Sequence, residues 1–368
     1  MKIAKVETIV LKKKVENPVS DSLHTLDVGG ALVTRIYTDD GIVGTGINTF
    51  GRIESGMATV KFIIDRELAP LLIGRDPNFT REIRHDMFFA TEYYGTIGVA
   101  NFAIAAIDCA IWDIKGKAAN LPVAHLLGAR RKAIPAYAMV GWYYKGGENE
   151  FVQQCIDCAE EGFKAVKLKV GKGSLQHDIE RIKTIRKELG QEFIIMVDAN
   201  CIFDEAEALR RGLAYQEYDI YWYEEPIQPY MRDAHTRLSQ KLTIPLAIGE
   251  NYFTRHQFYD VMKAGCLSIV QPDSRRAGGV TEWMDIGTIS EVMGFKLASH
   301  GGGPGNVNVL CAIENAIYLE TGSLKHEGGE DSFFTTRLKL VDGAVPIPDV
   351  PGMGNDVNED YIKKYRID

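Results

Sequence analysis

The feature that most constrains the fold of this chain is a series of eight short apolar runs beyond residue 133. Most of these runs carry a polar or charged residue at or near their end, and stretches with helical periodicity separate them. Strands that alternate with helices in this way are typical of a parallel α/β barrel. We therefore predict a modified TIM barrel of the (β/α)7β type over residues 128–330. The runs are IPAYAMV, AVKLKV, FIIMVDAN, YWYEEP, PLAIGE, SIVQPD, FKLASH and IYLE.

The chain before the barrel, residues 1–127, changes its pattern once. Up to Ile47 it alternates as antiparallel strands do, and from about Ile53 onward its apolar residues follow a helical period. The stretch 102–120 places apolar side chains along one broad helical face. We predict a small α+β domain here. We expect the tail, residues 331–368, to return to this domain rather than to add to the closed barrel.

Composition and local patterns exclude several kinds of partner. The formal net charge is −8, whereas proteins that bind nucleic acid cluster Lys and Arg on one face. No apolar run approaches the roughly 18 residues that span a bilayer, and the first residues resemble a strand rather than a signal peptide. We expect a cytoplasmic protein that binds neither nucleic acid nor membranes. The glycine-containing stretch 41–46 lies between strands rather than before a helix, which argues against a dinucleotide site.

The six cysteines are scattered along the chain, as is typical of reduced thiols in a cytosolic protein. Cys155 and Cys158 form a CxxC pair, but they lie in a helical stretch and no second CxxC completes a zinc site. We interpret them as half-buried thiols on a helix.

Three acidic residues end successive runs at equal spacing. Asp198, Glu224 and Glu250 follow one another at intervals of 26 residues (198 to 224 and 224 to 250). The carboxyl ends of parallel barrel strands meet at one face, so the three carboxylates converge there. Carboxylate oxygens suit Mg²⁺, and without a cation their mutual repulsion would destabilise the site. A single acid could be a solvated loop residue, but three at matching strand ends predict a magnesium site.

Two further pairs of residues are candidates for acid/base chemistry. Lys167 and Lys169 lie two apart on one run, so both side chains face the barrel interior. Burial and mutual proximity should lower their pKa values, so that one acts as a base while the other stays cationic and binds an anion. Asp273 and His300 end neighbouring runs, which is an arrangement in which a carboxylate orients an imidazole and raises its basicity.

Taken together, these motifs resemble the mandelate racemase and muconate lactonizing families of the enolase superfamily. The similarity spans essentially the whole chain, because the stretches AIDCAIWDIKGK and IPDVPGMG outside the barrel are also similar to those families. The motifs that carry it are KLK (167–169), VDAN (197–200), EEP (224–226), GEN (249–251), the pair Asp273 and His300, and Glu320.

The resemblance implies a role for each candidate residue. The three carboxylates would ligate Mg²⁺. Lys169 would be one base, with Lys167 as its electrostatic neighbour and a contact of the substrate carboxylate. Asp273 and His300 would form the second acid/base, on the opposite face of the substrate carbon. The metal and Lys167 would stabilise the negative charge that develops when the proton leaves.

The resemblance also points to residues that bind the substrate. Asn200 and Glu320 would be hydrogen-bond partners of the substrate, with Glu320 as a neutral acid toward its carboxylate. In this superfamily the N-terminal domain caps the barrel mouth, so we expect specificity loops at 19–27 and 49–55. The candidates that these loops offer are His24, Thr25, Asp27 and Arg52.

The sequence departs from the family pattern in two places, and the roles of the residues there stay open. Residues 301–303 are unusually rich in glycine, and Arg275 and Arg276 follow the sixth run. Either arginine could bind a second carboxylate or a neighbouring acid.

The favoured reaction is dehydration of a sugar acid, aldonic or aldaric, to a 2-keto-3-deoxy acid. A base removes the α-proton, and His300 protonates the departing β-hydroxyl. The alternatives are racemisation or epimerisation of a 2-hydroxy acid, with Lys169 and His300 as opposed bases, and cycloisomerisation of a sugar-acid lactone or anhydro sugar acid. All share the first step, so the residues alone do not separate them. A binding protein without activity is disfavoured, because every expected catalytic position is filled. We expect a small-molecule carboxylate as substrate and, from the resemblance, a homo-oligomer.

Overall fold

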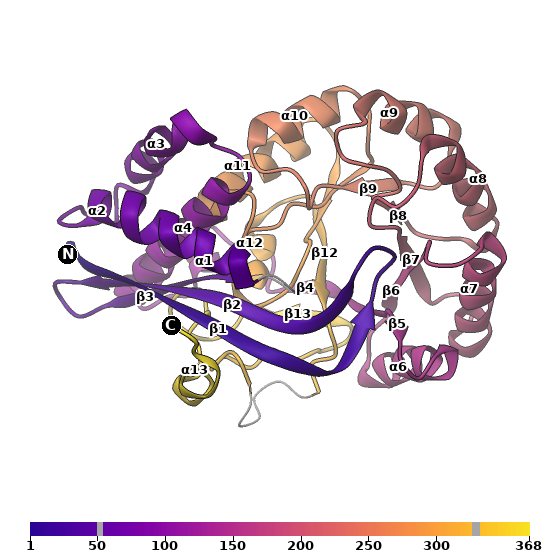
Figure 1. Ribbon diagram of the computed structural model, residues 1–368, viewed down its shortest axis with the longest axis horizontal. Helices are drawn as coiled ribbons and strands as arrows, with labels where there is room; N and C mark the ends of the chain where they lie inside the picture. Colours follow the sequence, from indigo (N-terminus) through magenta and orange to yellow (C-terminus); the bar gives the residue numbers. More distant parts are fainter. Residues whose placement is uncertain (50–53, 326–331) are drawn as a thin grey trace.

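The computed structural model, which describes residues 1–49, 54–325 and 332–368, contains the predicted closed barrel (Figure 1). Neighbouring strands of the barrel are parallel, and the last pairs with the first to close it. The strands are β4 (Ala133–Gly141), β6 (Ala165–Lys169), β7 (Ile194–Asp198), β8 (Tyr223–Glu224), β9 (Leu246–Ile248), β10 (Ile269–Val270), β11 (Lys296–Ala298) and β12 (Ala316–Thr321).

Seven long helices alternate with these eight strands in the fully described stretch 133–321, which gives the (β/α)7β arrangement. Side-chain caps and glycines set some of their ends: Ser174 accepts a hydrogen bond from the His177 backbone at the start of one helix, and Gly190 follows its last turn. The helices are α6 (Glu148–Glu161), α7 (Leu175–Leu189), α8 (Glu205–Tyr215), α9 (Arg232–Lys241), α10 (Arg255–Lys263), α11 (Gly279–Val292) and α12 (Pro304–Ala312).

The N-terminal region contains an antiparallel sheet in which β2 (Thr25–Thr38) lies between β1 (Ile3–Ser20) and β3 (Val43–Thr49). The β1–β2 hairpin reaches across the barrel (Figure 1), where its tip pairs with β5 (Tyr143–Tyr144), a short strand that follows β4. Sequence patterns did not indicate this pairing. It joins the sheet to the barrel mouth and places the hairpin tip above the carboxyl ends of the strands.

Helices cover one side of this sheet, and the longest of them, α4, lies unusually close to β3. A Cβ atom on Gly46 would lie 1.8 Å from the Ala106 carbonyl oxygen, so only glycine permits this approach.

None of the described helices is long and apolar enough to cross a bilayer. The helices of this region are α1 (Glu54–Ile63), α2 (Ala69–Leu72), α3 (Thr80–Thr91), α4 (Val99–Ala119) and α5 (Val123–Leu126), with the π-helical turn η1 (Ile64–Leu68) between α1 and α2.

The C-terminal segment contacts both the sheet and the barrel. The helix α13 (Glu359–Tyr365) lies beside β1, and the backbone N–H of Ile367 donates a hydrogen bond to the Val10 carbonyl. The strand β13 (Ala344–Pro346), however, pairs antiparallel with residues 133–135 of β4. The expectation that the tail adds nothing to the barrel sheet was therefore wrong. It was wrong because β4 is longer than its barrel pairing requires, so its first residues are available to another strand.

The barrel interior changes from apolar to polar along its axis. The part nearer the amino ends of the strands is filled by seven buried residues, which are Tyr137, Ala165, Met196, Trp222, Ala247, Ile269 and Ala298. On β6, Lys167 and Lys169 follow Ala165 at alternate positions and therefore lie on the same interior side, nearer the carboxyl end. The polar side chains of the barrel thus collect at one end, below the β1–β2 hairpin.

Candidate active site

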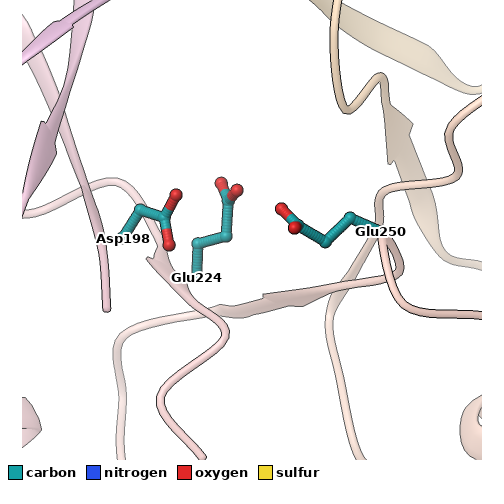
Figure 2. A group of neighbouring side chains, drawn as sticks. All are labelled: Asp198, Glu224 and Glu250. Carbon is teal, nitrogen blue, oxygen red and sulfur yellow. The ribbon is translucent and has the colours of Figure 1, made fainter. Parts of the chain in front are cut away.

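Three carboxylates converge at the carboxyl ends of neighbouring strands (Figure 2). Asp198 is the last residue of β7, Glu224 is the last of β8, and Glu250 follows β9 by two residues. One oxygen of each lies within 4.8 Å of the others. Asp198 and Glu224 are buried and Glu250 is half-buried, so the group is open to the solvent on the Glu250 side. This is the convergence that the spacing predicts.

Two buried ammonium groups lie against these carboxylates. Lys167 Nζ lies 2.6 Å from Glu224 Oε1 and 3.6 Å from Asp198 Oδ2, and Lys169 Nζ donates to Asp198 Oδ2 at 2.5 Å. Burial alone would lower both pKa values, but Glu224 holds the pKa of Lys167 well above its usual value and Asp198 raises that of Lys169. The prediction that the two lysines have depressed pKa values is therefore not met. The attraction of the nearby carboxylates outweighs the repulsion between the lysines.

The chemistry of this group fits a divalent cation. Burial and the neighbouring carboxylates of Asp198, Glu320 and Glu250 raise the pKa of Glu224 to about 7, even though Lys167 opposes the shift. The positive charges of Lys167 and Lys169 therefore do not balance the negative charges of the surrounding carboxylates. The donors of the group are all carboxylate oxygens, which suit Mg²⁺ better than soft transition metals.

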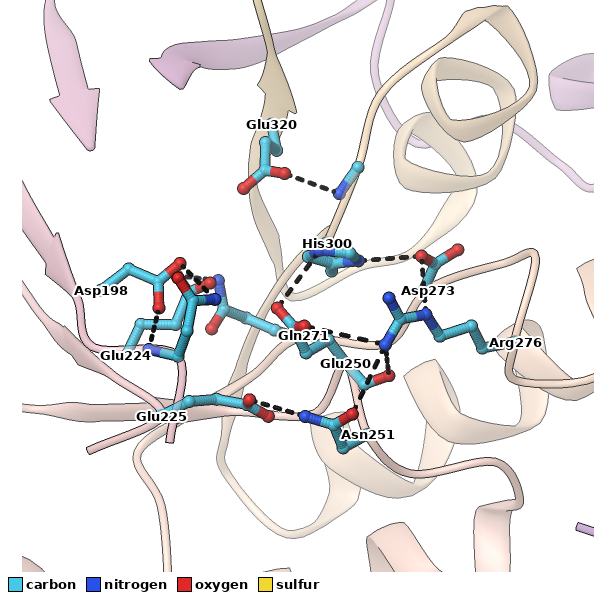
Figure 3. A network of polar contacts seen from close by, with 12 residues as sticks. Asp198, Glu224, Glu225, Glu250, Asn251, Gln271, Asp273, Arg276, His300 and Glu320 are labelled. Atoms are coloured by element: carbon cyan, nitrogen blue, oxygen red, sulfur yellow. Dashed lines mark hydrogen bonds and ion pairs between the residues drawn. The ribbon is translucent and has the colours of Figure 1, made fainter. Parts of the chain in front are cut away.

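An aspartate–histidine pair adjoins the carboxylates (Figure 3). His300 Nδ1 lies 2.8 Å from Asp273 Oδ2, and His300 Nε2 lies 3.2 Å from Glu250 Oε2. Burial would lower the pKa of His300, but Glu250 and the hydrogen bond with Asp273 raise it. Burial would raise the pKa of Asp273, yet Arg275 and His300 hold it well below its usual range. The imidazole is therefore oriented by an ionised carboxylate and directed at the predicted metal site.

Glu320, on the last barrel strand, accepts three hydrogen bonds. Its donors are Lys167 Nζ, the Tyr137 hydroxyl at 2.7 Å and the Gly301 backbone N–H at 3.0 Å. Burial would raise the pKa of Glu320, but Lys167 and then His300 lower it. The pairing with Lys167 therefore favours the ionised carboxylate, and the role of Glu320 as a neutral acid toward the substrate carboxylate stays a prediction.

The barrel mouth holds a cavity of about 450 Å³ beside the carboxylates. Lys169, Glu250 and His300 line it from the barrel side. The tip of the β1–β2 hairpin covers it, and the lining residues from this tip are Asp21, Leu23, His24 and Leu26. Both candidate bases therefore face one space, with the predicted metal ligands between their strands.

The hairpin places only some of the predicted loop residues at this cavity. His24 lines it and lies 3.5 Å from Asp21, measured from Nδ1 to Oδ2. Thr25 is exposed, its hydroxyl pairs with that of Ser20 at 3.1 Å, and it is not among the described residues that line the cavity. Its role as a substrate contact stays a prediction. Asp27 is also exposed. In a strand, residues 25 and 27 face away from the side that carries 24 and 26. Arg52 lies outside the described residues.

Asn200 occupies the cavity wall directly after β7. Its backbone N–H donates to Asp198 Oδ1 at 2.9 Å, and its side-chain Nδ2 lies 3.4 Å from Asp198 Oδ2. Its side-chain oxygen is buried and has no hydrogen-bond partner within residues 1–49, 54–325 and 332–368. An unpaired buried acceptor at a cavity is suited to a ligand hydroxyl. Its role as a substrate contact remains a prediction.

Sequence reasoning missed several residues that surround the carboxylates (Figure 3). Gln271 donates to Glu224 Oε2 at 2.9 Å, and Glu225 accepts from Asn251 Nδ2 at 2.7 Å. Burial raises the pKa of Glu225 well above its usual value. The sequence could have indicated that Gln271 faces the site, because it lies two residues before Asp273 and therefore on the same face of the run.

Both arginines that follow the sixth run pair with acids of the site. Arg275 Nε and Nη2 donate to the two oxygens of Asp273 at 2.8 and 2.6 Å. Arg276 Nη1 donates to the Glu250 carbonyl at 2.9 Å and lies 3.7 Å from Glu250 Oε1. Of the two roles left open by the sequence, the structure shows pairing with a neighbouring acid for each.

Known proteins are similar to this chain in both sequence and fold. Residues 5–128 match the family described as "Mandelate racemase / muconate lactonizing enzyme, N-terminal domain", and residues 150–361 match "Enolase C-terminal domain-like". An arabinonate dehydratase of Saccharolobus solfataricus is 34% identical over 93% of this chain and 91% of its own length. A 3,6-anhydro-alpha-L-galactonate cycloisomerase of Streptomyces coelicolor is 30% identical over 96% of each. A solved racemase from Streptomyces coelicolor with bound magnesium superposes with a TM-score of 0.92, at 28% identity, over 99% of this chain and 100% of its own.

Proposed function

Because this chain belongs to the mandelate racemase and muconate lactonizing enzyme family of the enolase superfamily, we propose that it is a magnesium-dependent enzyme that removes the proton next to a carboxylate group. The proposed reaction is dehydration of a sugar acid to a 2-keto-3-deoxy acid. The observation that carries it is the shared cavity of Lys169 and His300, which come from β6 and from the end of β11. The predicted metal ligands come from the strands between them.

Each group of the site has a task in this reaction. In its neutral amine form Lys169 removes the α-proton at its Nζ atom, and His300, oriented by Asp273, delivers a proton to the departing β-hydroxyl. Lys167 stays cationic and attracts the substrate carboxylate, while Asn200 accepts a hydrogen bond from a substrate hydroxyl. Asp198, Glu224 and Glu250 would hold Mg²⁺. When bound, the ion supplies positive charge that stabilises the developing negative charge of the substrate carboxylate.

Cycloisomerisation is the second candidate, favoured by the cycloisomerase relative at 30% identity. The first step would be the same, and His300 would protonate a ring oxygen instead of a hydroxyl. The dehydratase relative is slightly more similar, at 34% identity, which supports the order of the two candidates. The nature of the product separates them.

The proposal includes a cytoplasmic location and a homo-oligomeric state. The six cysteines are buried and carry no disulfide, which suits a reducing compartment. The oligomeric state rests on the family resemblance alone, and sedimentation of the purified protein tests it.

A screen of aldonic, aldaric, lactone and anhydro sugar acids with Mg²⁺ tests the reaction. Formation of a 2-keto-3-deoxy acid is expected, and chelation followed by Mg²⁺ addition should abolish and restore it. Replacement of Lys169 by Met or His300 by Asn should reduce turnover by several orders of magnitude. Lys172→Met is the matched control, because Lys172 is exposed and lies only three residues beyond Lys169. Ring opening without a keto acid would favour cycloisomerisation, and full activity without metal would contradict the proposal.

A further inference from the structure

We propose that Arg275 is a substrate-binding residue that donates hydrogen bonds to a hydroxyl group of the sugar acid. This inference rests on the proposed function and specifies the part of the substrate that the site recognises. Its basis is the position of the guanidinium group at the junction of two cavities, together with the matching glycine at position 301.

A second cavity of about 370 Å³ adjoins the active-site cavity. Three residues line both spaces, which are Thr49, Trp142 and Arg275. Lys169 and His300 line the first cavity, and Glu320 lines the second. A substrate that extends from the bases into the second cavity would lie along these shared residues.

Arg275 lies at the junction of the two cavities, and its guanidinium has more N–H groups than hydrogen-bond partners among the described residues. A guanidinium carries five N–H groups. Nε and Nη2 each donate one to Asp273, and Nη1 donates one to the Thr49 hydroxyl at the end of β3. One N–H of Nη1 and one of Nη2 have no partner among the residues that the structure describes. These three hydrogen bonds to Asp273 and Thr49 hold the group rigidly, so the remaining donors are preorganised.

Gly301 provides the space that this guanidinium occupies. A Cβ atom at position 301 would lie 2.2 Å from Arg275 Nη2, and Gly301 has a φ of +72°. The next residue, Gly302, is also restricted, because its Cβ would lie 2.5 Å from the Glu320 carbonyl oxygen. The two unusual features of the sequence, glycines after His300 and an arginine after Asp273, are therefore parts of one arrangement.

The charge balance at the junction favours a hydroxyl group over a second carboxylate. Asp273 accepts hydrogen bonds from the Arg275 guanidinium through both of its oxygens, which compensates much of its positive charge. A neutral hydroxyl can accept such a hydrogen bond without the cost of desolvating another charge. The site should therefore select a polyhydroxy acid for a hydroxyl beyond the carbons that react.

The test compares Arg275→Met with the wild-type protein on matched substrates. The substrates are the aldonic acid that the wild type converts fastest and its analogues lacking the hydroxyl at C4 or at C5. The wild type should prefer the parent acid over one analogue by roughly 10- to 100-fold in kcat/KM, as expected for a hydrogen bond from a charged donor. In Arg275→Met this preference should fall to about onefold.

An equal loss with all substrates would mean that Arg275 acts only by holding Asp273, and it would overturn the proposal. An aldaric acid that the wild type prefers and that loses most in Arg275→Met would overturn the assignment to a hydroxyl. Failure of the wild type to convert any sugar acid would instead contradict the proposed function, and this result is visible before any variant is made.

The packing part of the inference is tested without substrate. Gly301→Ala should lower Tm more in the wild-type background than in Arg275→Ala, because the smaller side chain removes the contact with the new Cβ. Gly147→Ala is the control for backbone strain, since Gly147 has a φ of +77° and open space around its Cβ position. Equal losses from Gly301→Ala in both backgrounds would contradict the contact.

Discussion

Replacement of Lys167 by methionine should destabilise the protein strongly, because three carboxylates depend on this ammonium group. The Lys167 side chain is 1% exposed, and its Nζ contacts Glu224, Asp198 and Glu320. Removing one partner of a buried ion pair costs about 3–5 kcal/mol, since the remaining charge stays buried without compensation. Native proteins are stable by about 5–15 kcal/mol, so the variant should lose a large fraction of its free energy of unfolding.

Urea unfolding followed by tryptophan fluorescence measures this loss, with Trp222 as one of the four tryptophans that contribute to the signal. The Trp222 indole N–H donates to Glu224 Oε2 at 3.1 Å, so the probe lies at the site. We expect a decrease of about 3–5 kcal/mol in EDTA for Lys167→Met and of at most about 0.5 kcal/mol for the exposed control Lys172→Met. Mg²⁺ at about 100 times its Kd should add roughly 2.7 kcal/mol to the wild type. A Lys167→Met protein within about 1 kcal/mol of the wild type in EDTA would refute the charge argument.

Further predictions concern pH, packing and thiol reactivity. His235 is buried, and burial lowers its pKa to about 4. The unfolded chain therefore binds a proton near pH 6.5 that the folded protein takes up only near pH 4, so stability should fall by about 3 kcal/mol as the pH drops through this range. In His235→Gln, urea titrations at several pH values should lack this component; parallel curves for both proteins would contradict it. Gly46→Ala should cost roughly 3 kcal/mol, because its Cβ would lie 1.8 Å from the Ala106 carbonyl oxygen; an unchanged Tm would show that α4 can move. Cys155 and Cys158 should resist thiol reagents in the native state, since burial raises both pKa values; rapid labelling would contradict their burial.

The convergence of the metal ligands could be predicted because it depends only on strand order. Asp198, Glu224 and Glu250 end successive runs, and parallel strands bring such ends to one face whatever the loops do. The same reasoning placed Asp273 beside His300. For these residues, the periodic order of strands along the sequence was sufficient to predict which side chains lie together.

Features that depend on three-dimensional contacts could not be predicted in the same way. The lowered pKa of Glu320 follows from its contact with Lys167, which lies on a strand 153 residues earlier in the chain. The pairing of β13 with β4 depends on how far β4 extends below its barrel partners. The place of Thr25 outside the cavity lining could not be predicted, because the face that a hairpin presents depends on its register, which the loop sequence does not reveal. The link between Arg275 and Gly301 required the rotamer of the arginine.

Deuterium exchange in His300→Asn tests the division of roles between the two bases most directly. The variant is incubated in D₂O with Mg²⁺ and the sugar acid that the wild type converts, and NMR follows both the α-proton and the keto product. Since Lys169 removes the α-proton and His300 is needed for loss of the hydroxyl, the variant should exchange the α-proton without forming keto acid, whereas Lys169→Met should do neither. Formation of keto acid by His300→Asn at the wild-type rate, or exchange by Lys169→Met, would contradict these roles.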